Sequence, residues 1–315
     1  MKYKNLSEAE IEHFKSLYKD KNVSKEKAQG ILSGIFNVSE RTIRRWANNL
    51  GLNMLNDNTK AKVMVYDIET SRTKAWVWWT GKQYVGHHQL IDEPKVITVS
   101  WKWLGESKIH YLTWDKNHCD KKLMKKFLVH YNKADMVIGY NNDRFDNRWI
   151  NARAMKYNLD VNVNVKSFDI MKEEKRVFRV PSYSMAYMSK YSNVVHKQGH
   201  EGLHMWNMIQ TGTKAEQKEY LQKMVEYNMG DIAATEELYF RLRRYFKQQL
   251  HFGVMAGGEK YTCPECGGTD VSLYKTTFTA AGTMQHIMKC NVDNVQYKIS
   301  RRDYLKFVAD HGESF

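Results

Sequence analysis

The sequence predicts an α/β protein in which a central sheet with flanking helices is joined to one small all-α domain and one small cysteine-bearing domain. Strand-like apolar runs alternate with helical patterns between residues 62 and 250. Residues 1–56 show helical patterns alone, and three of the four cysteines lie near the other end of the chain. A length of 315 residues, 42% of them hydrophobic, is sufficient for a sizeable core.

The chain is strongly basic and lacks a membrane signature. Its formal charge is +14, so we expect an anionic partner such as nucleic acid. No apolar run approaches the roughly 18 residues of a membrane span, and the first residues lack the pattern of a secretory leader. We therefore expect a cytoplasmic protein with no membrane partner. Crowded cysteines in such a protein favour metal binding over disulfides.

Residues 1–56 carry the pattern of three short helices. Ser7 and Glu10 have the spacing of a capping box, which starts the first helix. Ser24 can cap the second helix and Ser39 the third. Each helix has apolar residues on one face, which predicts a small all-α domain with its own core.

The third helix, residues 39–50, is the basic one. Its apolar residues Ile43 and Trp46 are expected to face inward. The outward-facing residues that would contact DNA are Arg41, Thr42, Arg44 and Arg45. The arrangement resembles a helix-turn-helix whose third helix is the recognition helix, and residues 1–56 hold ten Lys/Arg against six Asp/Glu. The alternative is a three-helix bundle used for protein contact.

The central segment opens with a strand that presents two acids. Residues 63–70 form an apolar, β-branched run that contains Asp67 and Glu69. Side chains alternate along a strand, so these two acids point to the same face. The apolar run indicates a buried strand, where two unneutralised carboxylates would be costly. The pair therefore predicts a divalent cation, although acids on a strand often only face water.

More strands and helices follow along the chain. Strand-like runs lie at residues 76–79, 96–103, 109–114 and 135–140. Helical spacing is found at residues 121–131, after Asp146, and within 216–246. The first three strand-like runs after the acids follow one another directly, which predicts an antiparallel meander around Asp67.

Two more acids stand at places suited to a ligand site. Asp146 follows a strand and starts a helix, and both strand ends and helix N-termini favour anionic groups and ligands. The alternative is that Asp146 only caps its helix. Tyr227 and Asp231 are four residues apart in a helical segment, so they share one helical face. This spacing also occurs by chance.

Together these residues follow the order of a known set of motifs. The motifs are Asp67-Ile68-Glu69, then Asn141 with Phe145-Asp146, then Tyr227 with Asp231. Over residues 62–250 the chain resembles the DEDD exonucleases with a catalytic tyrosine, as in the proofreading domains of family B DNA polymerases and their stand-alone, often viral, relatives. The resemblance implies an RNase H-like fold with a mixed five-stranded sheet. It also implies 3′-5′ exonuclease activity that depends on two Mg²⁺ or Mn²⁺ ions.

The same resemblance implies a role for each residue. Asp67 is expected to bridge both cations, and Glu69 and Asp231 to complete the site that holds the attacking water. Asp146 is expected to serve the second cation. Two cations about 3.5–4 Å apart can activate the water and stabilise the leaving oxygen. Tyr227 is expected to position the water or to help deprotonate it.

Residues near Asp146 are expected to contact the substrate. They are Asn141, Arg144, Phe145 and Arg148. For Trp76, Trp78 and Trp79 two interpretations stay open, since indoles can stack on nucleic-acid bases, whereas alternating tryptophans are also typical of core residues on a strand. Asp169 is expected to be structural, at the end of a strand.

Residues 261–302 resemble a zinc ribbon, with two strands between the pair Cys263/Cys266 and Cys290. Its expected ligands for one structural Zn²⁺ are Cys263, Cys266, Cys290 and Asp293. Asp293 stands where a second cysteine is usual, and a carboxylate can bind zinc. The rival ligand His286 would have its Cα about 13 Å from that of Cys290 along a strand. A site with three protein ligands, or unligated thiols, are the remaining alternatives.

The sequence therefore predicts a three-part nuclease. Its parts are a helix-turn-helix at 1–56, an exonuclease domain at 62–250 and a zinc ribbon at 261–302, with linkers at 57–61 and 251–260 and a tail at 303–315. The helix-turn-helix and the polymerase-like motifs favour DNA over RNA. The alternatives are a DNA-binding regulator or repair adaptor that keeps the fold as a platform, a ribonuclease, and a structure-specific endonuclease. A replication or repair partner cannot be named from the sequence.

Overall fold

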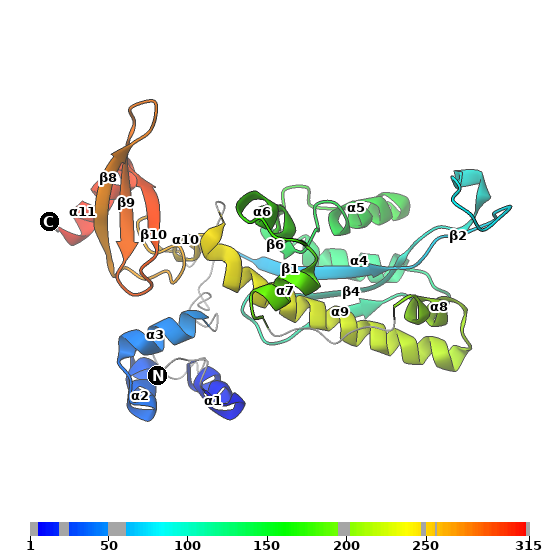
Figure 1. The fold of residues 1–315 in the computed structure, drawn as a ribbon, viewed down its shortest axis with the longest axis horizontal. Coiled ribbons are helices and arrows are strands. Elements are labelled where there is room, and N and C mark those ends of the chain that lie inside the picture. Colours follow the sequence, from blue (N-terminus) through cyan, green and yellow to red (C-terminus); the bar gives the residue numbers. More distant parts are fainter. Residues whose placement is uncertain are drawn as a thin grey trace. The chain divides into compact units, whose positions relative to one another are not determined.

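The computed structural model shows two compact units (Figure 1). The units are Met1–Ala61 with Arg243–Phe315, and Lys62–Leu242. The described residues are 6–18, 25–49, 61–194, 202–246, 250–255 and 257–312. None of the helices among these residues is both long and apolar enough to cross a membrane.

A mixed five-stranded sheet forms the centre of the Lys62–Leu242 unit. In spatial order its strands are β5 (His110–Thr113), β4 (Val96–Trp103), β1 (Val63–Thr70), β6 (Met136–Gly139) and β7 (Lys166–Asp169). β1, β4 and β5 form an antiparallel meander, in which β1 stands in place of the expected strand at residues 76–79, and β6 and β7 add in parallel. The α/β fold class and the mixed five-stranded sheet of an RNase H-like fold are thus confirmed.

Helices flank this sheet. They are α4 (Lys121–Tyr131), α5 (Asp146–Tyr157), α6 (Ile170–Val177), α7 (Met185–Tyr191), α8 (Leu203–Thr211) and α9 (Lys214–Leu242). Alternate residues of β1, namely Met64, Tyr66 and Ile68, enter the core that α4 and α5 share. Asp67 and Glu69 therefore point to the other face of β1, and the long helix α9 packs against this strand.

One expected strand lies outside the sheet. Residues 76–79 follow the two-residue strand β2 (Lys74–Ala75), which pairs with β3 (Leu90–Asp92). The 3₁₀ helix η2 (His87–Gln89) precedes β3. We call residues 72–91 the aromatic arm, which leaves the sheet between β1 and β4 (Figure 1). The strand prediction was wrong because alternating tryptophans are typical of a half-buried strand, whereas these tryptophans are exposed.

A tight turn after β6 places Asp146 beside the sheet. A Cβ at Gly139 would lie 2.7 Å from Cβ of Asn142, so the turn folds back closely only with glycine at this position. Asn141 then adopts a left-handed conformation with φ of 65°. The chain reverses within a few residues, and Asp146 becomes the first residue of α5.

The N-terminal helices form a small core of their own. They are α1 (Glu8–Tyr18), α2 (Lys25–Phe36) and α3 (Glu40–Asn49). Ile43 and Trp46 are buried in that core, as expected. The expected capping box is present, because the N–H of Ser7 donates to Glu10 Oε2 at 2.7 Å and the N–H of Glu10 donates to Ser7 Oγ at 3.3 Å. Ser24, the expected cap of α2, lies outside the described residues.

The C-terminal segment contains more structure than expected. Its elements are β8 (Val271–Phe278), β9 (Met284–Cys290), β10 (Gln296–Ser300) and α11 (Arg301–His311). The two expected strands are present, and β10 completes an antiparallel three-stranded sheet. Helix α11 starts where Ser300 Oγ accepts the N–H of Asp303, and Phe307 is buried in the same core as Tyr261. The expectation of a tail from residue 303 was therefore wrong.

Residues 251–260, expected to be a linker, include the short helix α10 (Phe252–Met255). The N–H of Phe252 donates to the carbonyl of Pro264 at 3.0 Å. A Cβ at Gly253 would lie 2.0 Å from Thr262 Oγ1, so this segment packs closely against the start of the cysteine-bearing domain. The central unit ends at Leu242, before the expected boundary at residue 250.

Candidate active site

Strand β1 and helix α9 bring three carboxylates together. Asp67 and Glu69 come from β1 and Asp231 from α9, and one oxygen of each lies within 4.8 Å of the others. We call these three residues the acid cluster. Negative charges at this separation repel, and Asp231 is buried, so a cation among them would stabilise the group. A donor set of carboxylate oxygens suits Mg²⁺ or Mn²⁺.

Two neighbours of Asp231 on α9 contact the acid cluster. Asn228, which is fully buried, donates from Nδ2 to Asp67 Oδ2 at 2.6 Å. Tyr227 is hydrogen-bonded to Asp231. Burial, followed by the charges of Asp231, Glu69 and Asp67, raises the pKa of Tyr227 far above its ordinary value. The phenol therefore stays protonated at neutral pH and acts as a hydrogen-bond donor.

Asp146 lies beside the acid cluster but is not part of it. Its Oδ1 accepts the backbone N–H of Ile68 at 3.0 Å, so the carboxyl group reaches β1 between Asp67 and Glu69. Burial raises the pKa of Asp146 to about 7. A cation bound to this group would oppose that rise by favouring the carboxylate form.

The residues expected to contact the substrate surround the start of α5. Arg144, Phe145 and Arg148 are exposed, and the ring of Phe145 lies edge-on to that of Trp149. Asn141 is half-buried, and its N–H donates to Asp169 Oδ1 at 3.0 Å. The two arginines are accessible to a ligand, whereas the backbone of Asn141 is committed to the turn.

Asp169 lies at the end of β7 and caps α6. Its carboxylate accepts the backbone N–H groups of Lys172 and Asp143 at 3.2 and 3.3 Å. The basic side chains that follow have partners close by, since Lys172 pairs with Asp143 at 2.8 Å and Arg176 pairs with Glu173 at 2.7 Å. The structural role expected for Asp169 is therefore confirmed.

Asn228 was not predicted from the sequence as a site residue. A signal for it was present, because Asn228 lies on the same helical face as Asp231, and that face also carries the buried apolar residue Met224. A polar side chain on the buried face of a helix requires a hydrogen-bond partner. Asp67 provides that partner, so Asn228 helps to fix the orientation of the Asp67 carboxylate.

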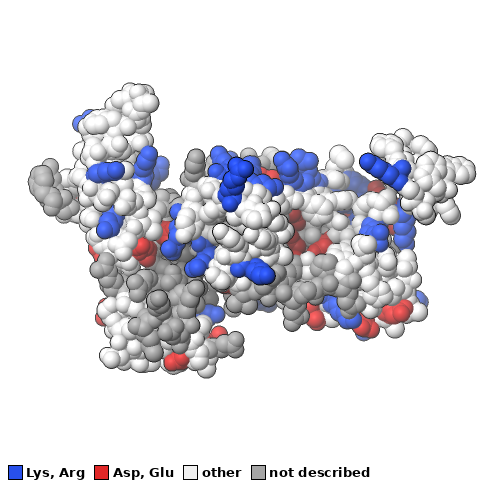
Figure 2. Space-filling view, viewed as in Figure 1, with Lys and Arg blue, Asp and Glu red and all other residues white. Residues whose placement is uncertain are grey.

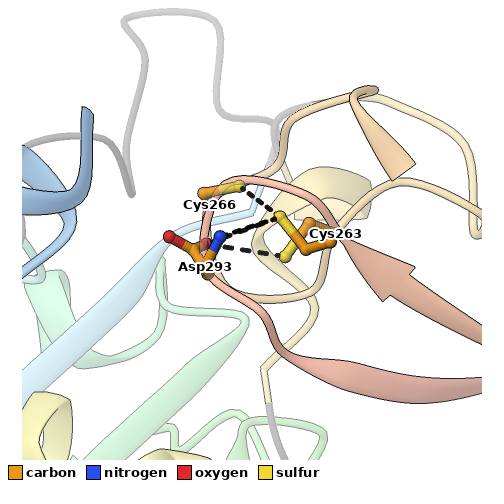
Figure 3. A group of neighbouring side chains, drawn as sticks. Cys263, Cys266 and Asp293 are labelled. Carbon is orange, nitrogen blue, oxygen red and sulfur yellow. Dashed lines mark hydrogen bonds between the residues drawn. The ribbon is translucent and has the colours of Figure 1, made fainter. Parts of the chain in front are cut away.

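A second group of ligand-type side chains lies in the C-terminal domain. We call Cys263, Cys266, Cys290 and Asp293 the thiol cluster; their ligand atoms lie within 4.8 Å of one another, and Figure 3 shows Cys263, Cys266 and Asp293 converging. The Sγ atoms of Cys266 and Cys290 are 3.7 Å apart, and Asp293 Oδ2 lies 3.8 Å from Sγ of both Cys263 and Cys290. Ligands around a tetrahedral zinc with bonds of about 2.3 Å are separated by about 3.8 Å.

Backbone N–H groups support each sulfur of the thiol cluster. The N–H groups of Glu265, Gly268 and Asp293 donate to the sulfurs of Cys263, Cys266 and Cys290 at 3.3, 3.4 and 3.4 Å. Donors aimed at sulfur stabilise the thiolate form that binds metal. The donor set and its spacing therefore fit a structural zinc ion.

The rival ligand His286 is used elsewhere. Its Nδ1 is hydrogen-bonded to Thr276 Oγ1 at 3.1 Å, and its ring stacks on Tyr304 with centroids 3.9 Å apart. It is not a member of the thiol cluster. His286 therefore stabilises the packing of α11 on the sheet, and Asp293 is the residue placed to be the fourth ligand.

The residues expected to contact DNA are placed only in part. The side chains of Arg41, Arg44 and Arg45 lie outside the described residues. Thr42 is half-buried, its N–H donates to Ser39 Oγ at 3.3 Å, and the two hydroxyl groups are 3.0 Å apart. Thr42 thus contributes to the start of α3.

Comparisons with known proteins find matches to part of this chain. The family B DNA polymerase from the hyperthermophilic archaeon Pyrobaculum calidifontis is similar at 14% sequence identity with a TM-score of 0.45, over 62% of this chain and 26% of the polymerase. The chain thus spans about a quarter of the polymerase's length. No curated protein matches the sequence. A family model, RNase_H_2 of the RNase H superfamily, matches residues 89–243. This range includes Asp146 and Asp231 and begins after β1. The central unit therefore contains an RNase H superfamily domain.

Proposed function

We propose that the Lys62–Leu242 unit is a metal-dependent exonuclease that removes nucleotides from the 3′ ends of nucleic acid, with DNA favoured over RNA. The observation that carries the proposal is the acid cluster of Asp67, Glu69 and Asp231, with Tyr227 hydrogen-bonded to Asp231. The RNase H superfamily domain supports a nuclease as the class of enzyme.

The residues that would hold two Mg²⁺ or Mn²⁺ ions are those that the resemblance implies. Asp67 would contact both ions, Glu69 and Asp231 would complete the first site, and Asp146 would serve the second. The carboxylate donors fit these hard cations. When bound, a pair of such cations activates a water molecule and stabilises the leaving 3′ oxygen of an in-line displacement.

Two residues of the chain would orient the reacting groups. Asn228 holds the Asp67 carboxylate through its side-chain amide. Tyr227 would donate its hydroxyl proton to a hydrogen bond that orients the attacking water. Alternatively, the hydroxyl group would help to deprotonate that water. Arg144 and Arg148, both exposed beside the start of α5, would contact backbone phosphates.

The flanking domains would raise affinity without changing the chemistry. The three-helix domain would bind DNA as a helix-turn-helix, and the C-terminal domain would hold one zinc ion and contact nucleic acid or a partner protein. Binding modules tethered to a catalytic unit increase its effective concentration at the substrate. The formal charge of +14 supports a polyanionic ligand for the whole chain.

The test is a cleavage assay on strands labelled at the 3′ or the 5′ end, in both DNA and RNA, with Mg²⁺, Mn²⁺ or chelator. We expect mononucleotides to leave the 3′ end, faster from DNA, and only with a divalent cation. A closed circular strand is the control for endonuclease activity and should stay intact. Binding without shortening of any strand would instead support a DNA-binding regulator or adaptor, and cleavage of the circle would support an endonuclease.

A further inference from the structure

The aromatic arm exposes an unusual concentration of large rings. The exposed fractions of Trp76, Trp78, Trp79 and Tyr84 are 75%, 90%, 59% and 93%. The core interpretation of the tryptophans is therefore excluded. Leu90 and Ile91 on the same arm are exposed as well. Large apolar side chains exposed together on one segment indicate an interaction site.

Hydrogen bonds anchor the base of the arm to the unit that carries the acid cluster. The N–H of Arg72 donates to Gln210 Oε1 at 3.0 Å, and Gln210 Nε2 donates to the carbonyl of Arg72 at 3.1 Å. On the returning chain, the N–H of Lys95 donates to Ser71 Oγ, and the N–H of Ser71 donates to the carbonyl of Lys95, both at 2.8 Å. The arm therefore leaves the sheet in a defined direction.

The two sides of the arm are also tied to each other. The N–H of Trp76 donates to the carbonyl of Gln89 at 2.9 Å, and Gln89 Nε2 donates to the carbonyl of Trp76 at 3.1 Å. The N–H of Gly86 donates to Gln89 Oε1 at 2.8 Å. Because these bonds hold the backbone together, the exposed rings lie on an ordered hairpin.

The charges of the arm favour an anionic ligand. Between residues 72 and 91 the arm carries Arg72, Lys74 and Lys82 and no acidic residue. The acids at its base have basic partners, since Asp92 pairs with Lys95 at 2.7 Å and Glu93 pairs with Arg153 at 2.8 Å. In Figure 2 the arm, at the upper right, is largely white with blue basic side chains. An anion with flat apolar faces would match both the rings and the charge.

We propose that the aromatic arm binds single-stranded nucleic acid by stacking its bases on Trp76, Trp78, Trp79 and Tyr84. Aromatic side chains and basic residues together are the usual means of binding single strands, because every unpaired base offers a π-face. A duplex keeps its bases stacked on one another, so it gains little from the rings. The proposal deepens the proposed function by assigning the arm as a surface that binds the strand, and in that respect it rests on that function.

The aromatic arm lies close in sequence to the strand that carries Asp67 and Glu69 of the acid cluster. Trp76 follows Glu69 by seven residues, which span at most about 25 Å when fully extended. A single strand held on the arm would therefore lie within a few nucleotides of the carboxylates. The arm would select unpaired ends and keep them near the site of hydrolysis.

Binding is tested apart from cleavage, on the full chain in chelator. The double variant Trp78→Ala/Tyr84→Ala removes the two most exposed rings of the arm, and the matched control Tyr111→Ala removes a half-exposed ring from β5. Fluorescence anisotropy of labelled oligothymidine should show roughly tenfold or greater weakening for the double variant. A labelled blunt duplex should bind within about twofold of the wild type, and so should oligothymidine to the control.

Two results would overturn the proposal. Unchanged affinity of the double variant for oligothymidine would mean that the rings serve another class of ligand, such as a protein surface. Equal weakening for single strand and duplex would mean that the rings do not read unpaired bases. If the chain is not a nuclease, the wild-type protein will leave every labelled end intact with Mg²⁺. The difference in oligothymidine affinity between wild type and the double variant would still be seen, so the two failures can be told apart.

Discussion

The acid cluster and the thiol cluster are both suited to metal, but they are built in opposite ways. The thiol cluster draws four ligands from a short stretch of chain, and backbone N–H groups support its three sulfurs. The acid cluster draws oxygens from a strand and a distant helix, and two of its three members are only half-buried. A closed set of four ligands is typical of structural zinc, whereas an accessible and incomplete set leaves positions for water and substrate.

This contrast predicts that metal at one site maintains the fold and metal at the other supports the chemistry. The thiol cluster has neighbours that are themselves part of the small C-terminal core, such as Tyr261 and Met288. The acid cluster is backed by a large core that does not depend on it, because the alternate residues of β1 pack on α4 and α5. Removing a ligand should therefore have different consequences at the two sites.

The largest expected effect is at the thiol cluster. Cys266→Ser should remove the zinc and unfold the C-terminal domain, because apparent binding free energies of structural zinc are about 10–16 kcal/mol. Zinc content by elemental analysis and thermal unfolding by circular dichroism measure this. Cys119→Ser, which changes a cysteine outside the cluster, is the matched control and should retain both zinc and fold. Full zinc content in Cys266→Ser would refute the structural role.

The next effect is at the acid cluster. Asp67→Ala should lower the rate of 3′-end cleavage by at least about a thousandfold, because the residue expected to contact both cations is lost. Zinc content and thermal midpoint should not fall, and salt-sensitive binding through the basic flanks should persist. Asp160→Ala, at an exposed acid of the same unit, serves as the control. Loss of folding in Asp67→Ala would undermine the assignment of a metal site.

A smaller effect is expected for the tyrosine that contacts the acid cluster. Tyr227→Phe keeps the ring and removes the hydroxyl, and should lower kcat about a hundredfold with little change in KM. Steady-state kinetics on a short DNA strand measure both. Tyr220→Phe on the same helix removes a hydroxyl that contacts His204, and should have no effect on kcat. Equal rates for wild type and Tyr227→Phe would contradict the orienting role.

Another buried carboxyl group, Glu174, differs from the acid cluster because burial favours its protonated form. The hydroxyl of Tyr140 lies 2.6 Å from Glu174 Oε2 and 2.9 Å from the carbonyl of Tyr183. The hydroxyl donates to Glu174 Oε2, and this hydrogen bond lowers the pKa of the carboxyl group. Burial has the larger effect and raises that pKa to about 7 from its ordinary value of 4.5.

The smallest expected effect concerns the pH dependence of stability. Because the pKa of Glu174 is higher in the folded chain than in the unfolded one, the folded chain binds the extra proton between pH 4.5 and about 7. Stability should therefore decline across that window. Glu174→Gln keeps an acceptor for the Tyr140 hydroxyl and, because it cannot ionise, should remove much of this decline. Urea unfolding at pH 5 and pH 8 measures the decline. The same loss of stability between these pH values in wild type and Glu174→Gln would refute the assignment.

The sequence alone was sufficient for the features that depend on local alternation and spacing. Asp67 and Glu69 lie on one face because strand residues alternate, and Tyr227 lies near Asp231 because four residues make about one helical turn. Within each half of the thiol cluster the ligands are three residues apart, and the resemblance to a zinc ribbon relates the two halves. The mixed sheet followed from the resemblance, which relates motifs that are far apart.

Features that depend on tertiary contacts could not be predicted in this way. The tryptophans of the arm have the alternation of a core strand, and they are exposed because no element among the described residues of the unit covers them. The contact of Asn228 with Asp67 joins residues that no local pattern relates. Helix α11 was missed because its single buried anchor, Phe307, gives a weak apolar periodicity.

The bond between Asp146 and Ile68 has a further consequence. Strand β6 pairs with β1 only from Val63 to Val65, so beyond that point the sheet opens and the Asp146 carboxyl group accepts the Ile68 N–H where a neighbouring strand would. Any ligand that draws the Asp146 carboxyl group away would release this amide to solvent. The hydrogen-exchange rate of the Ile68 amide would therefore report whether the second cation site is occupied. This measurement requires neither substrate nor cleavage.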